Sequence, residues 1–175
     1  NDTLFEKLPS YRTGINFKNS LSFKERFNIF TYRNYYNGGG VGLGDINNDG
    51  FLDIYFTSNL NENKLYINKG NFSFEDVTET AGVGGTKSWS TGVSLVDINA
   101  DGFLDIYVSN SGDIEGDNKQ NELFINNGDL TFTEKAKEYG LDDMGYSTHA
   151  AFFDYDRDGD LDRKSTRLNS SHLVI

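Results

Sequence analysis

Three stretches of the chain carry an oxygen-bearing side chain at every second position, followed by a glycine. They read Asp45-Ile-Asn-Asn-Asp-Gly-Phe-Leu-Asp53, Asp97-Ile-Asn-Ala-Asp-Gly-Phe-Leu-Asp105 and Asp154-Tyr-Asp-Arg-Asp-Gly-Asp-Leu-Asp162. A tight loop with this spacing can turn its first, third and fifth side chains inward, and the glycine at the sixth position permits a sharp reversal. Such a loop favours the binding of a hard cation by oxygen atoms.

The expected cation is Ca²⁺, which takes six to eight oxygen ligands in a flexible arrangement, whereas Mg²⁺ prefers a rigid octahedron that keeps several waters. The predicted ligands are the side chains at positions 1, 3, 5 and 9 and the backbone carbonyl at position 7. They are Asp45, Asn47, Asp49, Asp53 and the carbonyl of Phe51; Asp97, Asn99, Asp101, Asp105 and the carbonyl of Phe103; and Asp154, Asp156, Asp158, Asp162 and the carbonyl of Asp160.

Two other interpretations of these loops compete with a calcium site. One acidic turn without metal would be unremarkable, but three turns with the same spacing favour a metal site. An EF-hand needs glutamate at position 12, which falls here on Phe56, Val108 and Ser165. The flanking residues also alternate between apolar and polar like strands, so the EF-hand interpretation is rejected.

The loops belong to a longer internal repeat. Their first aspartates lie 52 and 57 residues apart (97 − 45 and 154 − 97), and residues 63–70 match residues 121–128. In the first unit we predict strands at 41–44, 52–57, 64–68 and 72–77, with a possible helical turn at 134–139 in the second. The predicted class is all-β: a partial β-propeller of about three four-stranded blades with calcium loops between strands. An elongated β-solenoid is the alternative.

The repeat divides the chain into five segments. Residues 1–34 are expected to end a preceding blade and connect it, residues 35–87 and 88–144 to form two blades, and residues 145–161 to start a third. Residues 162–175 break the pattern and can be reverse-translated into a common sequencing-library adapter, so we interpret them as an adapter-derived tail. The chain starts at Asn1 without a signal peptide, which indicates either that a signal was removed or that the sequence is a fragment.

Composition excludes several classes of protein. The chain has 27 acidic and 16 basic residues and a net charge of −11, which argues against nucleic acid as a partner. It has no apolar run of about 20 residues, so no membrane span is expected. It has no cysteine, so disulfides and thiolate metal sites are absent.

With these loops and strands, the sequence resembles FG-GAP/VCBS-type repeat proteins, which build integrin-α-like, calcium-binding β-propellers. Residues 28–50 are similar to a bacterial branch related to cartilage acidic protein and UnbV-containing proteins. The resemblance covers about residues 4–161. It implies a propeller of about seven blades, of which this chain holds two full units and parts of two others, in an exported or surface-anchored protein.

The favoured function is a non-catalytic, calcium-stabilised scaffold of a secreted, periplasmic or cell-surface protein, with an extracellular protein or glycan as ligand. The alternative is the propeller portion of a larger secreted enzyme that acts on carbohydrate or another extracellular substrate. Against catalysis, His149 is the only histidine outside the tail, and its neighbours Ser147 and Thr148 do not make a triad by adjacency.

Several aromatic side chains have two possible roles. Trp89 could stack on a sugar if it is exposed, and belongs to the core if it is buried. The same alternatives apply to Tyr32, Tyr35 and Tyr36, which lie beside three consecutive glycines. Their solvent exposure separates a glycan-binding face from ordinary packing.

Overall fold

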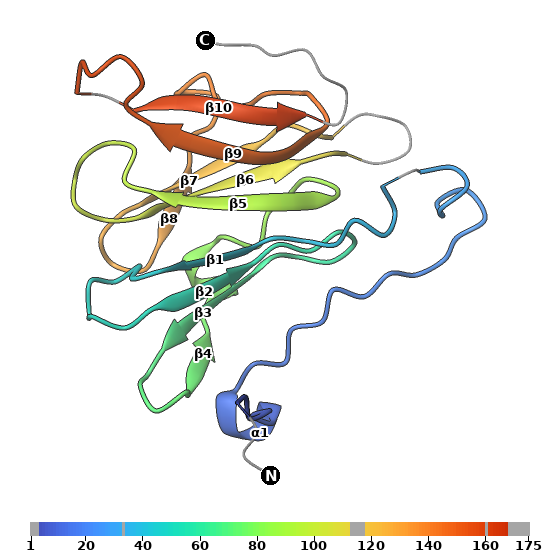
Figure 1. Ribbon diagram of the computed structural model, residues 1–175, viewed down its shortest axis with the longest axis horizontal. Helices are drawn as coiled ribbons and strands as arrows, with labels where there is room; N and C mark the ends of the chain where they lie inside the picture. Colours follow the sequence, from blue (N-terminus) through green and yellow to red (C-terminus); the bar gives the residue numbers. More distant parts are fainter. Residues whose placement is uncertain (1–3, 33, 113–117, 160, 168–175) are drawn as a thin grey trace.

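The computed structural model describes residues 4–32, 34–112, 118–159 and 161–167 (Figure 1). In chain order the elements are α1 (Ser10–Thr13), β1 (Val41–Gly44), β2 (Asp53–Phe56), β3 (Lys64–Asn68), β4 (Phe74–Asp76), α2 (Thr78–Ala81), β5 (Ser90–Val96), β6 (Asp105–Asn110), β7 (Glu122–Asn126), β8 (Phe132–Glu134), β9 (Ser147–Phe153) and β10 (Asp162–Arg167).

The strands form three antiparallel sheets in which neighbours in sequence are neighbours in space. The sheets are β1-β2-β3-β4, β5-β6-β7-β8 and the pair β9-β10. Figure 1 shows them stacked with β1, β5 and β9 side by side, and β5 contacts both of the other strands. Successive four-stranded meanders that meet through their first strands have the arrangement of propeller blades. The all-β, propeller-like prediction is therefore confirmed.

The predicted strands agree closely with the observed ones. Residues 41–44 and 64–68 match β1 and β3, whereas the expected strand at 72–77 is the shorter β4. The difference arises because Asn71 and Phe72 have positive φ angles of 51° and 59°, so the turn continues past Gly70 before β4 begins. The turn predicted around residues 134–139 is present, since β8 ends at Glu134 and the amide of Tyr139 then donates to the carbonyl of Lys135 at 3.1 Å.

Two short helices were not predicted from the sequence. Helix α1 ends at Gly14 with φ of 76°, and α2 ends at Gly82 with φ of 74°. Glycine reaches this left-handed conformation without steric cost and so ends a helix readily. Each helix has four residues, which is too short to produce helical periodicity in the sequence.

The main core lies between the first two sheets. It joins Leu65 and Ile67 of β3 to Ile106 and Val108 of β6, with Tyr55 of β2 among them. A second cluster joins the middle sheet to the third one, and includes Tyr107 and Ala150. All six residues of β6 are buried because sheets cover both of its faces, whereas β2 alternates between buried and half-buried residues.

The inner strands of adjacent sheets approach each other closely. A Cβ atom at Gly92 would lie 2.3 Å from the carbonyl oxygen of Thr148, so no side chain fits at this position. The Thr91 hydroxyl donates to the carbonyl of Ser147 at 2.8 Å, and the Thr57 hydroxyl donates to the carbonyl of Thr91 at 2.9 Å. Threonine hydroxyls thus link the three sheets where their inner strands meet.

The N-terminal segment packs on the first sheet. Phe17 stacks on Phe56 with ring centroids 4.7 Å apart, and Asn19 donates to the side chain of Asn59 at 2.8 Å. At the other end, Asp162–Arg167 pairs with β9 as an antiparallel strand. The five segment boundaries, and the adapter interpretation of residues 162–175, stay predictions.

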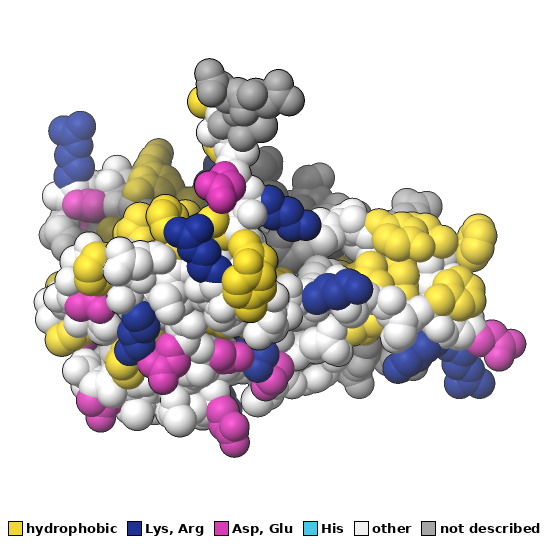
Figure 2. Space-filling view, turned by 90° about the horizontal axis from the view of Figure 1, so that it is seen from below, with side chains coloured by type: hydrophobic (Ala, Val, Ile, Leu, Met, Phe, Trp, Pro, Cys, Tyr) yellow, Lys and Arg dark blue, Asp and Glu magenta, His cyan; other side chains and the backbone are white. Residues whose placement is uncertain are grey.

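Neither helix in the described part of the chain has the length or the apolar character needed to cross a membrane. Acidic and basic side chains are interspersed on the face shown in Figure 2, which presents no continuous basic surface.

Candidate metal centre

The first two aspartate loops each lie between an inner strand and the next strand of the same sheet. Loop 1 (residues 45–53) connects β1 to β2, and loop 2 (residues 97–105) connects β5 to β6. We call residues 154–162, between β9 and β10, loop 3. Each loop is thus held between two paired strands, which fixes its ends.

The first aspartate accepts two backbone hydrogen bonds in loops 1 and 2 and one in loop 3. Asp45 accepts from the amides of Asp49 at 3.0 Å and Gly50 at 2.8 Å. Asp97 accepts in the same way from the amides of the fifth and sixth residues of loop 2, at 3.0 and 2.9 Å. In loop 3, Asp154 accepts from the amide of Gly159 at 3.3 Å. Position 1 therefore folds the loop around its own carboxylate.

Positions 3 and 5 are brought to the same place. The Asn47 and Asp49 side chains lie 2.9 Å apart from amide nitrogen to carboxylate oxygen, and the Asn99 and Asp101 side chains lie 2.8 Å apart. Each position-5 aspartate also accepts from the amide at position 7, at 2.9 Å in both loops. The predicted ligands at positions 1, 3 and 5 therefore converge in loops 1 and 2.

The loops share an unusual backbone at positions 4 and 6. The fourth residues Asn48, Ala100 and Arg157 have φ angles of 58°, 58° and 64°, and the glycines at position 6 have φ angles of 87°, 90° and 96°. A left-handed conformation at a non-glycine residue costs energy and persists only where the surroundings impose it. Its recurrence shows that the three loops share one backbone shape.

The aspartates at position 9 close the loops at their base. Asp53 accepts from the amides of Ile46 and Asn68, both at 2.8 Å. Asp105 accepts from the amides of Ile98 at 2.9 Å and Asn126 at 2.8 Å. Both carboxylates are buried, with 1% and 0% of their surface exposed. Each oxygen keeps a further lone pair, so cation ligation by these two residues stays a prediction.

Burial raises the pKa of Asp53 and of Asp105 above the ordinary value. The backbone amides that donate to the two carboxylates lower this pKa. The charges at positions 1 and 5 of the same loop raise it further. Ionising either group therefore costs free energy in the metal-free fold, and a nearby cation would reverse this effect.

In loop 3, Asp154, Asp156 and Asp158 each offer one carboxylate oxygen, and these three oxygens lie within 4.8 Å of one another. Ligands on opposite sides of one Ca²⁺ are separated by about 4.6–5.2 Å, twice the calcium–oxygen distance, so this group fits one ion. Asp162 accepts from the amide of Tyr155 at 3.0 Å, as the position-9 residues of loops 1 and 2 do. Asp160 lies outside the described residues.

Of the four aromatic residues considered for sugar binding, three belong to the core. Trp89, Tyr35 and Tyr32 are 1%, 1% and 7% exposed and pack edge-to-face or tilted against one another and Phe27. The sugar-stacking role for Trp89 is therefore wrong, because its ring is covered. Tyr36 is 68% exposed.

Ser147 and His149 differ in their exposure to solvent. Ser147 is fully buried, and its hydroxyl accepts from the side-chain amide of Asn121 at 3.0 Å. His149 itself is exposed on β9.

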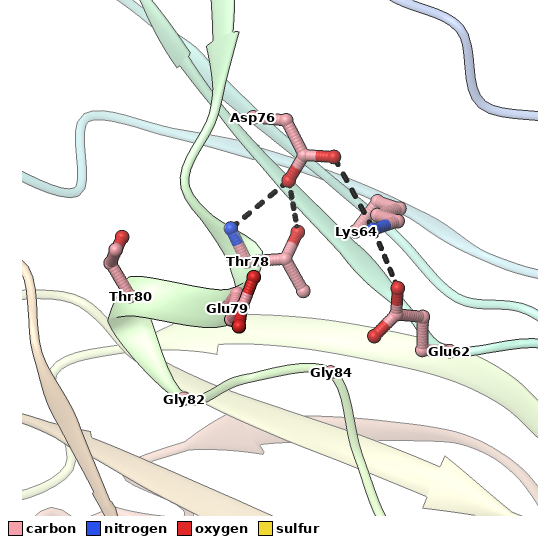
Figure 3. Close-up of a pocket in the computed structure, with 8 residues that line it drawn as sticks. All are labelled: Glu62, Lys64, Asp76, Thr78, Glu79, Thr80, Gly82 and Gly84. Atoms are coloured by element: carbon pink, nitrogen blue, oxygen red, sulfur yellow. Dashed lines mark hydrogen bonds and ion pairs between the residues drawn. The ribbon is translucent and has the colours of Figure 1, made fainter.

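A polar cleft of about 560 Å³ lies beside α2 (Figure 3). Lys64 is paired there with Glu62 at 2.7 Å and Asp76 at 3.3 Å. Burial would raise the pKa of Asp76, but hydrogen bonds from the hydroxyl and amide of Thr78, together with Lys64, outweigh it and lower this pKa. These contacts connect β3, β4 and α2, and the charges of Lys64, Glu62 and Asp76 are already paired.

Comparison with known proteins identifies the repeat. The family model described as "FG-GAP-like repeat" matches residues 45–108 and 111–163. Cartilage acidic protein 1 of Xenopus tropicalis is 32% identical over 130 residues, which cover 71% of this chain and 19% of that protein. Cartilage acidic protein 1 of Mus musculus is 37% identical over 76 residues, 43% of this chain and 12% of that protein. The chain thus spans less than a fifth of these relatives.

Proposed function

The chain belongs to the FG-GAP-like repeat family, and from this premise we propose that it is a calcium-binding, non-catalytic scaffold that presents its repeats to an extracellular protein or glycan. The repeats make it an integrin-like repeat scaffold. Calcium binding, ligand binding and export are our proposals for it.

The recurrence of one loop geometry carries the proposal. Loops 1 and 2 place oxygen-bearing side chains at positions 1, 3 and 5 with matching hydrogen bonds, and loop 3 gathers three carboxylates within 4.8 Å. All the side-chain donors offer oxygen, which suits Ca²⁺ rather than a softer metal. Like charges this close repel one another, so a bound cation would stabilise the loops.

The proposed sites are structural. Three separate loops hold separate ions, and each loop joins two strands, so calcium would stabilise the sheets rather than take part in a reaction. Calcium sites of extracellular modules have dissociation constants of about 10⁻⁴–10⁻³ M, which are filled outside the cell. This affinity range supports the proposal that the protein is exported or displayed at a surface.

Isothermal titration calorimetry tests the metal proposal directly. Chelator-stripped protein is titrated with CaCl₂, and MgCl₂ serves as the comparison. We expect calcium to bind at more than one site, and Asp49→Ala and Asp101→Ala each to remove one. A folded protein that binds no calcium at 10 mM, or that binds both metals equally well, would contradict the proposal.

Ligand binding requires a second experiment. The stripped and the calcium-loaded protein are applied in parallel to an array of glycans and to immobilised extracellular matrix proteins. Binding that requires calcium and is lost in the variant carrying Asp49→Ala together with Asp101→Ala would support a calcium-supported binding surface. Equal binding by the stripped protein would argue against one.

A further inference from the structure

Loops 1 and 2 are in direct contact although they lie 52 residues apart in sequence. The side-chain amide of Asn48, at position 4 of loop 1, donates to the carbonyl of Gly102, at position 6 of loop 2, at 3.0 Å. Both residues lie inside their loops, between predicted ligands. A change in the shape of one loop therefore reaches the other through a single hydrogen bond.

A second, buried connection runs through Asn126 at the end of β7. Its side-chain amide donates to the carbonyl of Ile46 in loop 1 at 2.9 Å and to the carbonyl of Leu104 in loop 2 at 3.2 Å. Its backbone amide donates to Asp105 at 2.8 Å. Asn126 is 3% exposed, so water hardly competes for these bonds. One residue thus fixes the bases of both loops.

Of these two connections, only the one at Asn48 involves a residue type that differs between the two repeats. Position 4 is occupied by Ala100 in loop 2, which has the same φ angle of 58° but no side-chain donor. Asn68 occupies the position of Asn126 in the first sheet, and its side chain donates to the carbonyl of Leu52 in its own loop at 3.0 Å. The link at Asn48 is therefore an addition to the shared loop structure.

We propose that cation binding at loops 1 and 2 is positively coupled, with Asn48 as the coupling residue and Asn126 as the fixed support beneath it. This inference rests on the proposed calcium function and adds a regulatory property to those sites. A cation in loop 2 holds the Gly102 carbonyl in place, which orients Asn48. Part of the ordering that loop 1 needs to bind its own cation is then already present.

The coupling is reciprocal by thermodynamic necessity, so each loop improves the affinity of the other by the same factor. A single net hydrogen bond supports a factor of about 3 to 10. At calcium concentrations near the dissociation constants, the two loops would fill together over a narrower range than two independent sites.

Nuclear magnetic resonance of the ¹⁵N-labelled full chain measures each loop separately, because the amides of Gly50 and Gly102 report on loops 1 and 2. Metal-stripped protein is titrated with CaCl₂. We expect Asp101→Ala, which disables loop 2, to weaken calcium binding at loop 1 about 3- to 10-fold. Asp49→Ala is expected to weaken binding at loop 2 by the same factor.

Asn48→Ala identifies the coupling residue, because alanine already adopts this backbone conformation at position 100. In the Asn48→Ala background, Asp101→Ala should change loop 1 affinity less than 2-fold. Asn127→Ala is the matched control, because this exposed asparagine donates to Thr131 within its own hairpin at 3.0 Å. This variant should leave the coupling unchanged.

The outcomes separate the two proposals. If both glycines respond to calcium but Asp101→Ala leaves loop 1 affinity unchanged, the coupling is wrong and calcium binding stands. If Asn48→Ala and Asn127→Ala preserve the coupling equally, the role of Asn48 is wrong. If neither glycine responds in a folded chain, calcium binding itself fails, and the coupling fails with it.

Discussion

The carboxylate of Asp53 accepts a hydrogen bond from the backbone amide of Ile46 at 2.8 Å, and this contact closes loop 1 across seven residues. The second oxygen of Asp53 reaches β3 through the amide of Asn68. One buried side chain thus joins the loop to its sheet. The relationship recurs between Asp105 and Ile98, so it belongs to the repeat unit.

Asp53→Ala is predicted to destabilise the protein even without metal. It leaves two backbone amides without their acceptor in a buried place, and we expect a loss of about 2–4 kcal/mol in the free energy of unfolding. Urea denaturation in the presence of a chelator measures this loss. Asp49→Ala is the control, because Asp49 is exposed and should change the metal-free stability by less than about 1 kcal/mol. Equal effects of the two variants would contradict a structural role for position 9.

The ionised carboxylates of Asp53 and Asp105 are predicted to lower the free energy of unfolding of the metal-free protein, and mild acid is predicted to restore part of it. Their pKa values are raised in the fold, so the folded state holds protons more tightly than the unfolded state. The destabilisation is fully present above the folded pKa and disappears as pH falls through it. We expect the wild type to gain stability relative to Asp53→Asn as the pH falls from neutral toward the ordinary aspartate pKa of about 4. Urea denaturation with chelator across this range checks the sign, and a relative loss would contradict it.

Asp76 is predicted to behave in the opposite way. Its pKa is lowered in the fold by Thr78 and Lys64, which outweigh the effect of burial. Its contribution to stability is therefore present above the unfolded pKa and is lost as pH falls through the folded one. The destabilising effect of Asp76→Asn should shrink as the pH falls below about 4, in urea denaturation from pH 6 to pH 3. An effect that stays constant would show that Asp76 keeps its ordinary pKa.

Gly92→Ala is predicted to disturb the contact between the second and third sheets. The new Cβ would lie 2.3 Å from a backbone carbonyl oxygen, so β9 must shift, at a cost of about 1–3 kcal/mol or more. Gly84→Ala is the matched control, since its nearest neighbour at 3.2 Å is the flexible end of Glu62. Thermal unfolding of both variants measures the difference. Similar melting temperatures would contradict the close approach of β5 and β9.

The burial of Trp89 is open to a spectroscopic test because it is the only tryptophan in the chain. With 1% of its surface exposed, its fluorescence should be blue-shifted in the folded protein and resist quenching by iodide. Trp89→Ala should cost about 3–5 kcal/mol, whereas Tyr36→Ala should cost less than about 1 kcal/mol. Easy quenching of the native fluorescence would restore a surface role for this ring.

Much of the fold could be predicted from the sequence because each repeat consists of short local sequence patterns. The strands at 41–44 and 64–68 were predicted to the residue from their places beside the metal loop and the hairpin turn, and the Asp-Gly spacing located all three loops. The glycine at position 6 was also predicted, since its residue type signals its backbone. The left-handed fourth position was missed because Ala100 and Arg157 give no such signal, and asparagine favours it only at position 48.

Features that depend on tertiary contacts could not be predicted. Asn126 and Ile46 are 80 residues apart, and nothing in either segment indicates that they meet. Whether Trp89 is buried depends on Phe27 and Tyr32, which come from a different part of the chain. The closing role of Asp53 likewise appears only once β3 lies beside the loop.

Thermal unfolding of the full chain, with chelator and with saturating calcium, distinguishes structural calcium sites from acidic turns, and Asp49→Ala and Asp101→Ala are measured alongside. Calcium at about 100 times its dissociation constant should stabilise the fold by about 2.7 kcal/mol per independent site. We expect the melting temperature to rise with calcium, and to rise less in each variant. An unchanged melting temperature in a cooperatively folded wild type would show that the loops are acidic turns without metal.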